Sequence, residues 1–164
     1  MKYIFDANTL IYLAKAGLLN FIKKYFVNDI NIDTHVYNES VVNAPEDKED
    51  SRIIKEFLAE NEIPIIPTQI DKALKIFYDA GEASCYELAG KSDIVVTNDR
   101  KAMTRLKKMN RDVVTLDDLI LKQYSNHYLN KETARIYLEK LKKVHAITPS
   151  QLLFYYRKMF QERV

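Results

Sequence analysis

The sequence has little of several features that mark particular classes of protein. Three glycines and four prolines in 164 residues are too few for long flexible linkers or for a glycine-rich loop that cradles phosphate. Cys85 is the only cysteine, which excludes an intrachain disulfide and a zinc site built from cysteines. We interpret Cys85 as a buried helix residue, because free cysteine behaves as a small apolar side chain.

Long apolar runs are also missing. No stretch approaches the roughly 20 apolar residues that span a membrane, and the chain reaches Asp6 before a signal peptide can develop. We therefore expect a cytoplasmic protein with no membrane partner. The length is about that of one domain, and an apolar content of 47% allows a sizeable core.

The net charge of +2 is too small to indicate a nucleic-acid partner by itself. Its distribution is more informative. Acidic residues gather in "NAPEDKED" and "DAGE", whereas basic residues gather later, in "RKAMTRLKKMNR" and "EKLKK". Such segregation can place a basic surface beside an acidic pocket, although a solvated helix face produces the same pattern.

Short apolar runs alternate with amphipathic stretches over the first 116 residues. Strands are predicted at residues 3–5, 30–32, 63–66, 94–96 and 112–115. Helices are predicted at residues 8–16, 18–26, 34–42, 51–61, 71–80, 81–90 and 99–110, with Thr34 and Ser51 as candidate N-caps. This alternation favours an α/β fold with a central parallel sheet flanked by helices.

Only helical patterns follow residue 116. They cover residues 116–125, 131–144 and 148–161. We therefore predict an α/β domain over residues 1–118 and a helical C-terminal extension over residues 119–164, packed on the same domain.

Acidic residues are placed around the ends of the predicted strands. Asp6 follows the first strand, and Asp99 follows the fourth. Glu39 lies in the helix after the second strand, and Glu82 begins the helix before the fourth. Because ligands of open α/β sheets gather at the carboxyl ends of the strands, these carboxylates can converge at one edge. Clustered carboxylates need a cation, and their oxygens suit Mg²⁺ or Mn²⁺, which activate water toward a phosphodiester.

Each of these residues also has a purely structural interpretation. Asp6 and Asp99 can cap the helices that follow them. Glu82 can complement a helix dipole, and Glu39 can be an ordinary solvated residue. Taken singly, none of the four is specific for a metal site.

Four motifs, in the expected order, resemble those of the PIN-domain nucleases. "FDANTLIYLAKAG" is similar to their opening motif and "THVYNES" to the second, while "DAGEASCYELAGKSDIVVTNDRKA" resembles the third and fourth together. The resemblance covers about residues 2–118. It implies a Rossmann-like PIN domain that is catalytic over residues 1–118, a Mg²⁺ or Mn²⁺ cofactor, and cleavage of RNA.

Carried over by position, the resemblance implies a catalytic set of four acidic residues, Asp6, Glu39, Glu82 and Asp99. The implied metal ligands are Asp6, Glu82 and Asp99. Two auxiliary polar residues, Asn8 and Thr97, would orient water or a ligand. Many members of the family are VapC-like toxin ribonucleases, which implies an antitoxin partner and a homodimer. One departure is Asn98, where the subgroup with Gly-Glu in its third motif often carries an aspartate.

We predict a metal-dependent endoribonuclease, possibly the toxin of a toxin–antitoxin pair. Three residues at helical spacing, Lys101, Arg105 and Lys108, are predicted to contact RNA phosphates without reading sequence. The alternative is a non-catalytic PIN-like module that binds RNA or protein. A pocket filled by arginine, lysine or the C-terminal helices would favour that alternative.

Overall fold

Five parallel strands form one sheet, in the order β3-β2-β1-β4-β5, in a computed structural model that describes residues 1–161. The strands are β1 (Tyr3–Phe5), β2 (Ile30–Asp33), β3 (Ile65–Ile66), β4 (Ile94–Val96) and β5 (Asp112–Val114). Each strand lies within or one residue beyond its predicted range. The sequence prediction of a central parallel sheet is therefore confirmed.

The central strand β1 is buried along its whole length. Tyr3 pairs with Ile30 of β2 on one side and with Ile94 of β4 on the other. Both faces of a parallel sheet are normally covered, so its strands form continuous apolar runs, as "YIF" does here. Cys85 is fully buried against this strand, as predicted, and its thiol donates to the Phe5 carbonyl at 3.9 Å.

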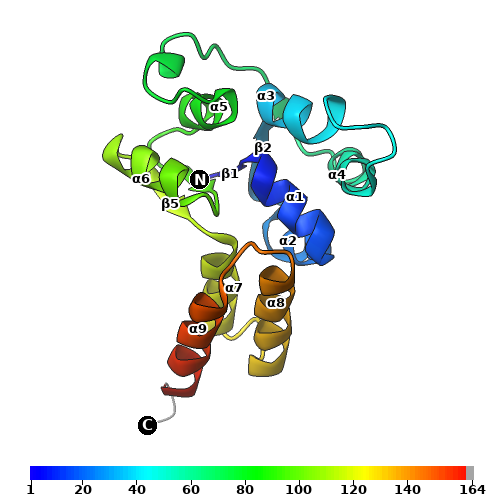
Figure 1. Ribbon diagram of the computed structural model, residues 1–164, viewed down its shortest axis with the longest axis vertical. Helices are drawn as coiled ribbons and strands as arrows, with labels where there is room; N and C mark the ends of the chain where they lie inside the picture. The colour runs from blue at the N-terminus through cyan, green and yellow to red at the C-terminus, as the bar shows by residue number, and fades with distance from the viewer. Residues whose placement is uncertain (162–164) are drawn as a thin grey trace.

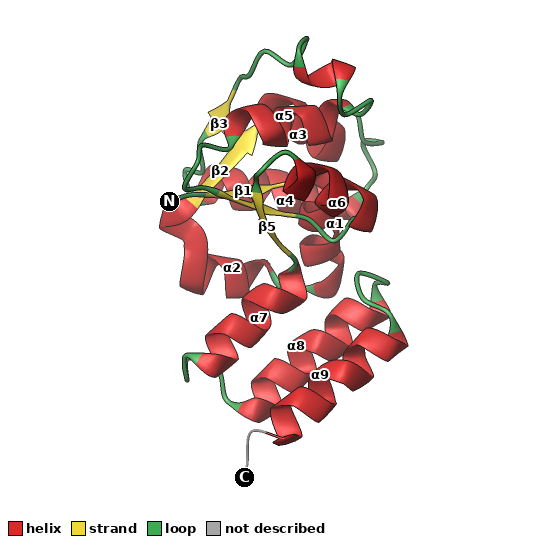
Figure 2. Ribbon diagram, turned by 90° about the vertical axis from the view of Figure 1, so that its left-hand side faces the viewer, coloured by secondary structure: helices red, strands yellow, loops and turns green. Residues whose placement is uncertain are grey.

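Helices flank the sheet, as Figures 1 and 2 show. The α-helices of the α/β body are α1 (Ala7–Ala16), α2 (Leu19–Phe26), α3 (Thr34–Tyr37), α4 (Glu49–Glu60), α5 (Ala80–Leu88) and α6 (Arg100–Lys108). A π-helix, η2 (Asn38–Val42), continues α3, and two short 3₁₀ segments are η1 (Val27–Asp29) and η3 (Ala73–Lys75). The α/β fold is confirmed.

The helical C-terminal region forms a layer of its own below the sheet in Figure 2. It comprises α7 (Leu116–Ser125), α8 (Lys131–Lys143) and α9 (Pro149–Gln161). Residues 162–164 of the predicted extension lie outside the described residues. Within residues 1–161, none of the helices combines the length and the apolar character needed to cross a bilayer.

Asn98 links this helical layer to the sheet. Its side-chain amide donates to Asp117 Oδ1 and to the Ala146 carbonyl, both at 3.1 Å, and its Oδ1 accepts from Leu116 N at 2.9 Å. The second oxygen of Asp117, which is 1% exposed, accepts from the Tyr155 hydroxyl. An ionised aspartate at position 98 has no proton to donate. The hydrogen bonds of the Asn98 amide to the C-terminal helical region therefore explain why this motif has asparagine in place of aspartate.

One predicted helix is wrong. Residues 71–79 contain only the 3₁₀ segment Ala73–Lys75, followed by a turn in which Tyr78 has a φ of 25°, and Ala80 already belongs to α5. Asp79 has extended backbone angles because its side chain caps α5 by accepting from Glu82 N at 2.9 Å. A residue with extended backbone cannot continue a helix, so the chain breaks there.

Two predicted caps are also wrong. Asp33, not Thr34, caps α3, since its Oδ1 accepts from His35 N at 2.7 Å. Helix α4 begins at Glu49, so Ser51 lies inside it and is buried. In both cases the N-cap position lies before the predicted one.

Candidate active site

A pocket of about 140 Å³ opens at the carboxyl edge of the sheet. It is lined by Asp6, Ala7, Asn8, Glu39, Asp79, Gly81, Glu82, Asp99 and Ala102. Figure 1 shows helices α1, α3, α5 and α6 arranged around this part of the molecule. The four predicted acidic residues and Asn8 therefore reach the same pocket, although they come from four separate segments of the chain.

Asp6 joins the end of β1 to the start of α1. It caps the helix, because its Oδ1 accepts from Thr9 N at 2.7 Å. Burial raises the pKa of the Asp6 carboxyl, and the charge of Asp99 adds to the increase, whereas hydrogen bonds with Thr9 and Thr97 oppose it. Burial in the pocket therefore disfavours the ionised form of this carboxylate.

Asp99 occupies the matching position after β4. Its Oδ1 accepts from Lys101 N at 2.7 Å and from Ala102 N at 3.1 Å, which caps α6. Its own backbone N–H donates to the buried Thr97 hydroxyl at 3.1 Å. The side chain of Thr97 also lowers the pKa of Asp6, so Thr97 is close to both carboxylates. Capping occupies one oxygen of Asp99 and leaves the other for a further ligand, so the structural and the functional interpretations are compatible.

Glu39 reaches the pocket from the π-helix that follows α3. Burial is the main cause of its raised pKa, followed by the negative charges of Asp79 and Asp6. π-helical segments are rare and are often found at functional sites. This carboxylate is therefore held near two others at the cost of favouring its protonated form.

Glu82 is held by an arginine. Arg105 Nε donates to Glu82 Oε2 at 2.8 Å, and Arg105 Nη2 contacts Oε1, so the pair is bidentate. The bond raises the pKa of the Arg105 guanidinium. Arg105 was predicted to bind RNA phosphate, but here it binds a site carboxylate. Lys101 and Lys108 lie on the same helix and are exposed.

Two pocket residues that affect how the carboxylates lie, Asp79 and Gly81, were missed in the sequence. Asp79 is close enough to Glu39 for its charge to raise the pKa of Glu39. The sequence prediction placed Asp79 in the last turn of a helix, although an Asp three residues before a Glu is a common pattern at helix N-termini. Gly81 fits against both acids: a Cβ there would lie 3.0 Å from Glu39 Oε2 and 3.2 Å from Asp79 Oδ1. Its lack of a side chain therefore lets these carboxylates approach.

The donor chemistry of the pocket fits a hard divalent cation. Five carboxylates line it, no lysine or arginine is among its lining residues, and oxygen donors suit Mg²⁺ and Mn²⁺. Within residues 1–161, however, no three His, Cys, Asp or Glu side chains lie close enough to hold a metal ion as they stand. A cation held here would need these carboxylates close together, which like charges tolerate only when a cation joins them.

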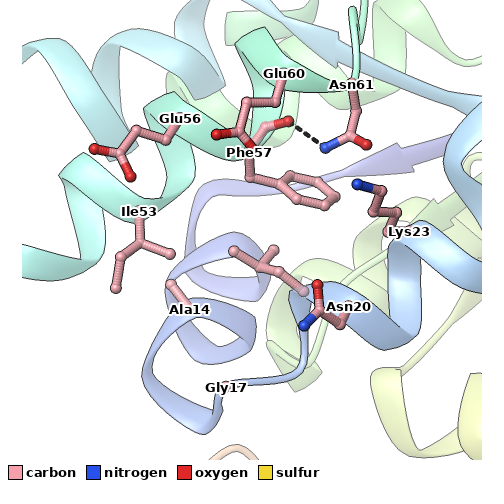
Figure 3. Close-up of a pocket in the computed structure, with 10 residues that line it drawn as sticks. Ala14, Gly17, Asn20, Lys23, Ile53, Glu56, Phe57, Glu60 and Asn61 are labelled. Atoms are coloured by element: carbon pink, nitrogen blue, oxygen red, sulfur yellow. Dashed lines mark hydrogen bonds between the residues drawn. The ribbon is translucent and has the colours of Figure 1, made fainter.

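A larger pocket, of about 290 Å³, lies elsewhere and has different chemistry (Figure 3). It lies between α1, α2 and α4, with Ile53 and Phe57 among its apolar walls and Glu56, Glu60 and Lys23 among its charged residues. Its α1 residues are at the end of that helix opposite Asp6. The carboxylates of the candidate site do not reach it, so its greater size does not make it the active site.

The sequence of this chain has a counterpart in a known family. Residues 2–160 match a family described as a PIN domain. The chain belongs to the PIN-domain family. The match extends past the four motifs and includes most of the C-terminal helices of this PIN domain. No curated protein and no solved structure matches the chain significantly.

Replacing Gly81 with alanine should weaken cation binding by this PIN domain without unfolding it. The new Cβ meets the flexible end of Glu39, which can move, and alanine favours a helix by up to about 1 kcal/mol over glycine. We expect an unchanged or slightly higher melting temperature in EDTA and a smaller rise on adding Mn²⁺. The control is Gly90→Ala, whose Cβ would meet Asp93 Oδ2 at 3.1 Å outside the pocket. An equal Mn²⁺ effect in both variants would contradict the role of Gly81.

Removing the arginine should have the opposite effect on cation binding. Arg105→Ala frees Glu82, and we expect the Kd for Mn²⁺, measured by calorimetry, to fall about fivefold, equivalent to about 1 kcal/mol for a partly exposed pair. The control is Lys108→Ala, three residues along the same helix, which should leave the Kd unchanged. Identical Mn²⁺ affinities in the wild type and Arg105→Ala would show that the ion pair does not compete with the cation.

Proposed function

We propose that this PIN domain is a metal-dependent endoribonuclease that hydrolyses RNA phosphodiester bonds. The observation that supports it best is the pocket at the carboxyl edge of β1 and β4, where five carboxylates from four separate segments line one cavity without a basic residue in the lining. Such a cluster is costly unless it binds a cation. Proteins of this family are generally nucleases.

The pocket residues have distinct roles in this proposal. Asp6 and Asp99 hold the cation, Mg²⁺ or Mn²⁺, and Glu82 joins them directly or through water after leaving Arg105. A divalent cation bound there would stabilise the charge that develops on the phosphodiester, and it would activate water. Glu39 holds a second ion or accepts the proton of the attacking water, and its raised pKa makes it a stronger base.

In this proposal, side chains around the pocket bind the RNA backbone. Lys101 and Lys108 are exposed on α6, the helix that begins at the pocket with Asp99. Lysines contact phosphates without reading the base sequence. Asn8, which is exposed in the pocket, orients a water or a phosphate oxygen, while the buried Thr97 supports Asp6 and Asp99.

One observation favours a second candidate, a non-catalytic PIN-like module that binds RNA or protein. Arg105 pairs with Glu82 and neutralises its charge. A PIN-like protein that binds no metal would need such a partner for this carboxylate. The C-terminal helices, in contrast, contribute no residue to the pocket lining, so they do not block it. Asp6, Glu39, Asp79 and Asp99 also remain in the lining without a lysine or arginine beside them there. We therefore favour the enzyme.

The resemblance to VapC-like toxins extends the proposal to partners. A toxin role, an antitoxin protein that binds this chain and a homodimer remain predictions. The first two are tested by co-purification with a small protein encoded beside this chain, and the third by light scattering.

The chemistry of the RNA products tests the proposed reaction. Attack by water on phosphorus, with departure of the 3′ oxygen, leaves a 3′-hydroxyl and a 5′-phosphate. We expect these ends when a mixed structured RNA pool is incubated with the protein and Mn²⁺, and no products in EDTA. Products that end in 2′,3′-cyclic phosphate and form in EDTA would contradict the proposal, since they arise from attack by the RNA's own 2′-hydroxyl.

A further inference from the structure

Ser51 has a buried side-chain hydroxyl that is not paired. The residue is 7% exposed, and its Oγ makes no hydrogen bond within the described part of the chain. Ser40 and Ser84, which are also buried in helices, each donate to a carbonyl of the preceding turn, at 2.8 and 2.9 Å. Buried polar groups are nearly always hydrogen-bonded. The Ser51 hydroxyl therefore needs a partner that residues 1–161 do not supply.

Ser51 lines a pocket of about 420 Å³ between η2 and α4, which pack side by side (Figure 1). This volume lies within the range of about 300–1,000 Å³ that is usual for small-molecule sites. Among the described residues, this pocket and the acidic pocket have no lining residue in common. The π-helix η2 contributes Glu39 to the acidic pocket, and Val41 and Val42 to this one. The pocket is therefore a separate site.

One wall of this pocket is a basic stripe, formed by Lys48, Ser51, Arg52 and Lys55. Their spacing of three and four residues places the side chains on one face of α4. The stripe begins at the N-terminal end of this 12-residue helix, where the helix dipole favours an anion. Glu46 is the one carboxylate in the described lining, and it is exposed. Three cationic side chains beside an unpaired hydroxyl are suited to binding a phosphate group.

The ion pairs already present on the basic stripe are long. Lys48 Nζ lies 3.7 Å from Asp50 Oδ2, and Arg52 Nη1 lies 3.5 Å from Glu56 Oε1. Charge-assisted hydrogen bonds are typically about 2.7–2.9 Å long. Arg52 and Glu56 are also well exposed, and exposed pairs contribute little to stability. A phosphate that approaches the stripe can therefore replace these contacts at little cost.

The rest of the lining is mainly apolar. Tyr37 and Val41 are half-buried against the core, and Val42 is 59% exposed. Inorganic phosphate would leave this apolar wall uncovered, whereas a phosphate attached to a flat, largely apolar body would cover it. We propose that the pocket binds a nucleoside monophosphate, with its phosphate on the basic stripe and its base against Tyr37 and Val42. The proposal does not depend on the ribonuclease function, because it involves neither a cation nor cleavage.

Isothermal titration calorimetry in EDTA tests the proposal. The probe is adenosine 5′-monophosphate (AMP), compared with adenosine and with inorganic phosphate. We expect AMP to bind at least about tenfold more tightly than either part, because both walls of the pocket contribute. Arg52→Ala and Lys55→Ala should each raise the Kd for AMP about tenfold, as expected for loss of a hydrogen bond to a charged group. The control is Arg135→Ala, which removes an exposed arginine of α8 that is also paired with a glutamate.

Ser51→Ala separates a role in binding from a role in folding. The change removes a buried hydroxyl that has no partner, so the melting temperature without AMP should be unchanged or slightly higher. The Kd for AMP should nevertheless rise about tenfold, because the phosphate loses a donor. A lower melting temperature with an unchanged Kd would show that Ser51 serves only the fold, and would overturn its place in the site.

The wild type and two further variants complete the test. The proposal is overturned if AMP does not bind, if inorganic phosphate binds as tightly as AMP, or if Arg135→Ala loses as much affinity as Arg52→Ala. Asp6→Asn should bind AMP as the wild type does, and a loss there would place AMP in the acidic pocket instead. Absence of RNA cleavage would refute the ribonuclease and leave this site standing.

RNA strands identify the source of the nucleotide. Displacement of AMP by a 5′-phosphorylated RNA 10-mer, but not by the same strand with a 5′-hydroxyl, would assign the pocket to the end of an RNA chain. Displacement by neither strand would assign it to the free nucleotide. Displacement by both strands would show that internal phosphates suffice, and would overturn the assignment of a monophosphate.

Discussion

Replacing Asp6 with asparagine is expected to lower RNA cleavage at least about 100-fold, the effect typical of losing one group that acts in the chemical step. The variant should nevertheless be more stable than the wild type when metal is absent. Asparagine retains an oxygen that can accept from Thr9 N, so the cap of α1 is kept. It removes a charge that burial disfavours.

The sign of the stability effect follows from linkage. The folded-state pKa of Asp6 is raised above its unfolded value, so the folded chain binds the proton more tightly than the unfolded chain. Stability therefore falls as the pH rises from the ordinary carboxyl range to the raised folded-state pKa, and the loss persists above it. Glu39 acts in the same direction. At neutral pH the wild type carries this penalty and Asp6→Asn does not.

Thermal melting in EDTA measures this effect. For a chain of this size each 1 kcal/mol of relief raises the melting temperature by about 3 °C. The difference between Asp6→Asn and the wild type should shrink as the pH is lowered, and added Mn²⁺ should stabilise only the wild type. The control is Asp112→Asn, an exposed residue at the start of β5. A variant less stable than the wild type in EDTA would show that Asp6 is mainly structural.

Replacing Asn98 with aspartate is expected to destabilise the protein severely. The change removes the amide that donates to Asp117 and to the Ala146 carbonyl, and it places a second carboxylate beside a buried one. Leaving a buried charge without its partner costs about 3 kcal/mol or more, which corresponds to a melting temperature lower by roughly 10 °C. Acidic pH should restore part of the loss, because a protonated carboxyl can donate again.

A double variant separates this mechanism from a general effect of added charge. Asn98→Asp combined with Asp117→Asn exchanges donor and acceptor, so it should recover part of the stability that Asn98→Asp loses. Asn43→Asp adds the same charge at an exposed position and should melt within a degree or two of the wild type, as surface substitutions usually do. Absence of recovery in the double variant would argue against a direct bond between residues 98 and 117.

The sheet and most of the carboxylates that line the pocket could be predicted, because both depend on local sequence. Each strand is a short apolar run, and the polar residues that follow β1 and β4, Asp6 and Asp99, must lie at the same edge of a parallel sheet. The same rule brings Glu39 and Glu82 close to that edge. The pattern alone therefore specified four of the five carboxylates in the lining.

The features that could not be predicted depend on partners distant in the sequence. Arg105 pairs with Glu82, 23 residues away, and Asn98 donates to the Ala146 carbonyl, 48 residues away. No periodicity encodes such contacts. The helical pattern at residues 71–80 failed for a related reason, because Asp79 was needed to cap α5 and its extended backbone interrupts the helix.

The central claim is that the carboxylates at the carboxyl edge of the sheet form a cation-dependent centre for RNA cleavage. Its most direct test is the rate of cleavage of a mixed structured RNA pool as a function of Mn²⁺ concentration, with purified wild type and Asp6→Asn prepared side by side. We predict a rate that saturates with Mn²⁺ in the wild type, is abolished by EDTA, and is lower by at least about 100-fold in the variant at every concentration. Equal cleavage by both proteins would contradict the assignment of this site.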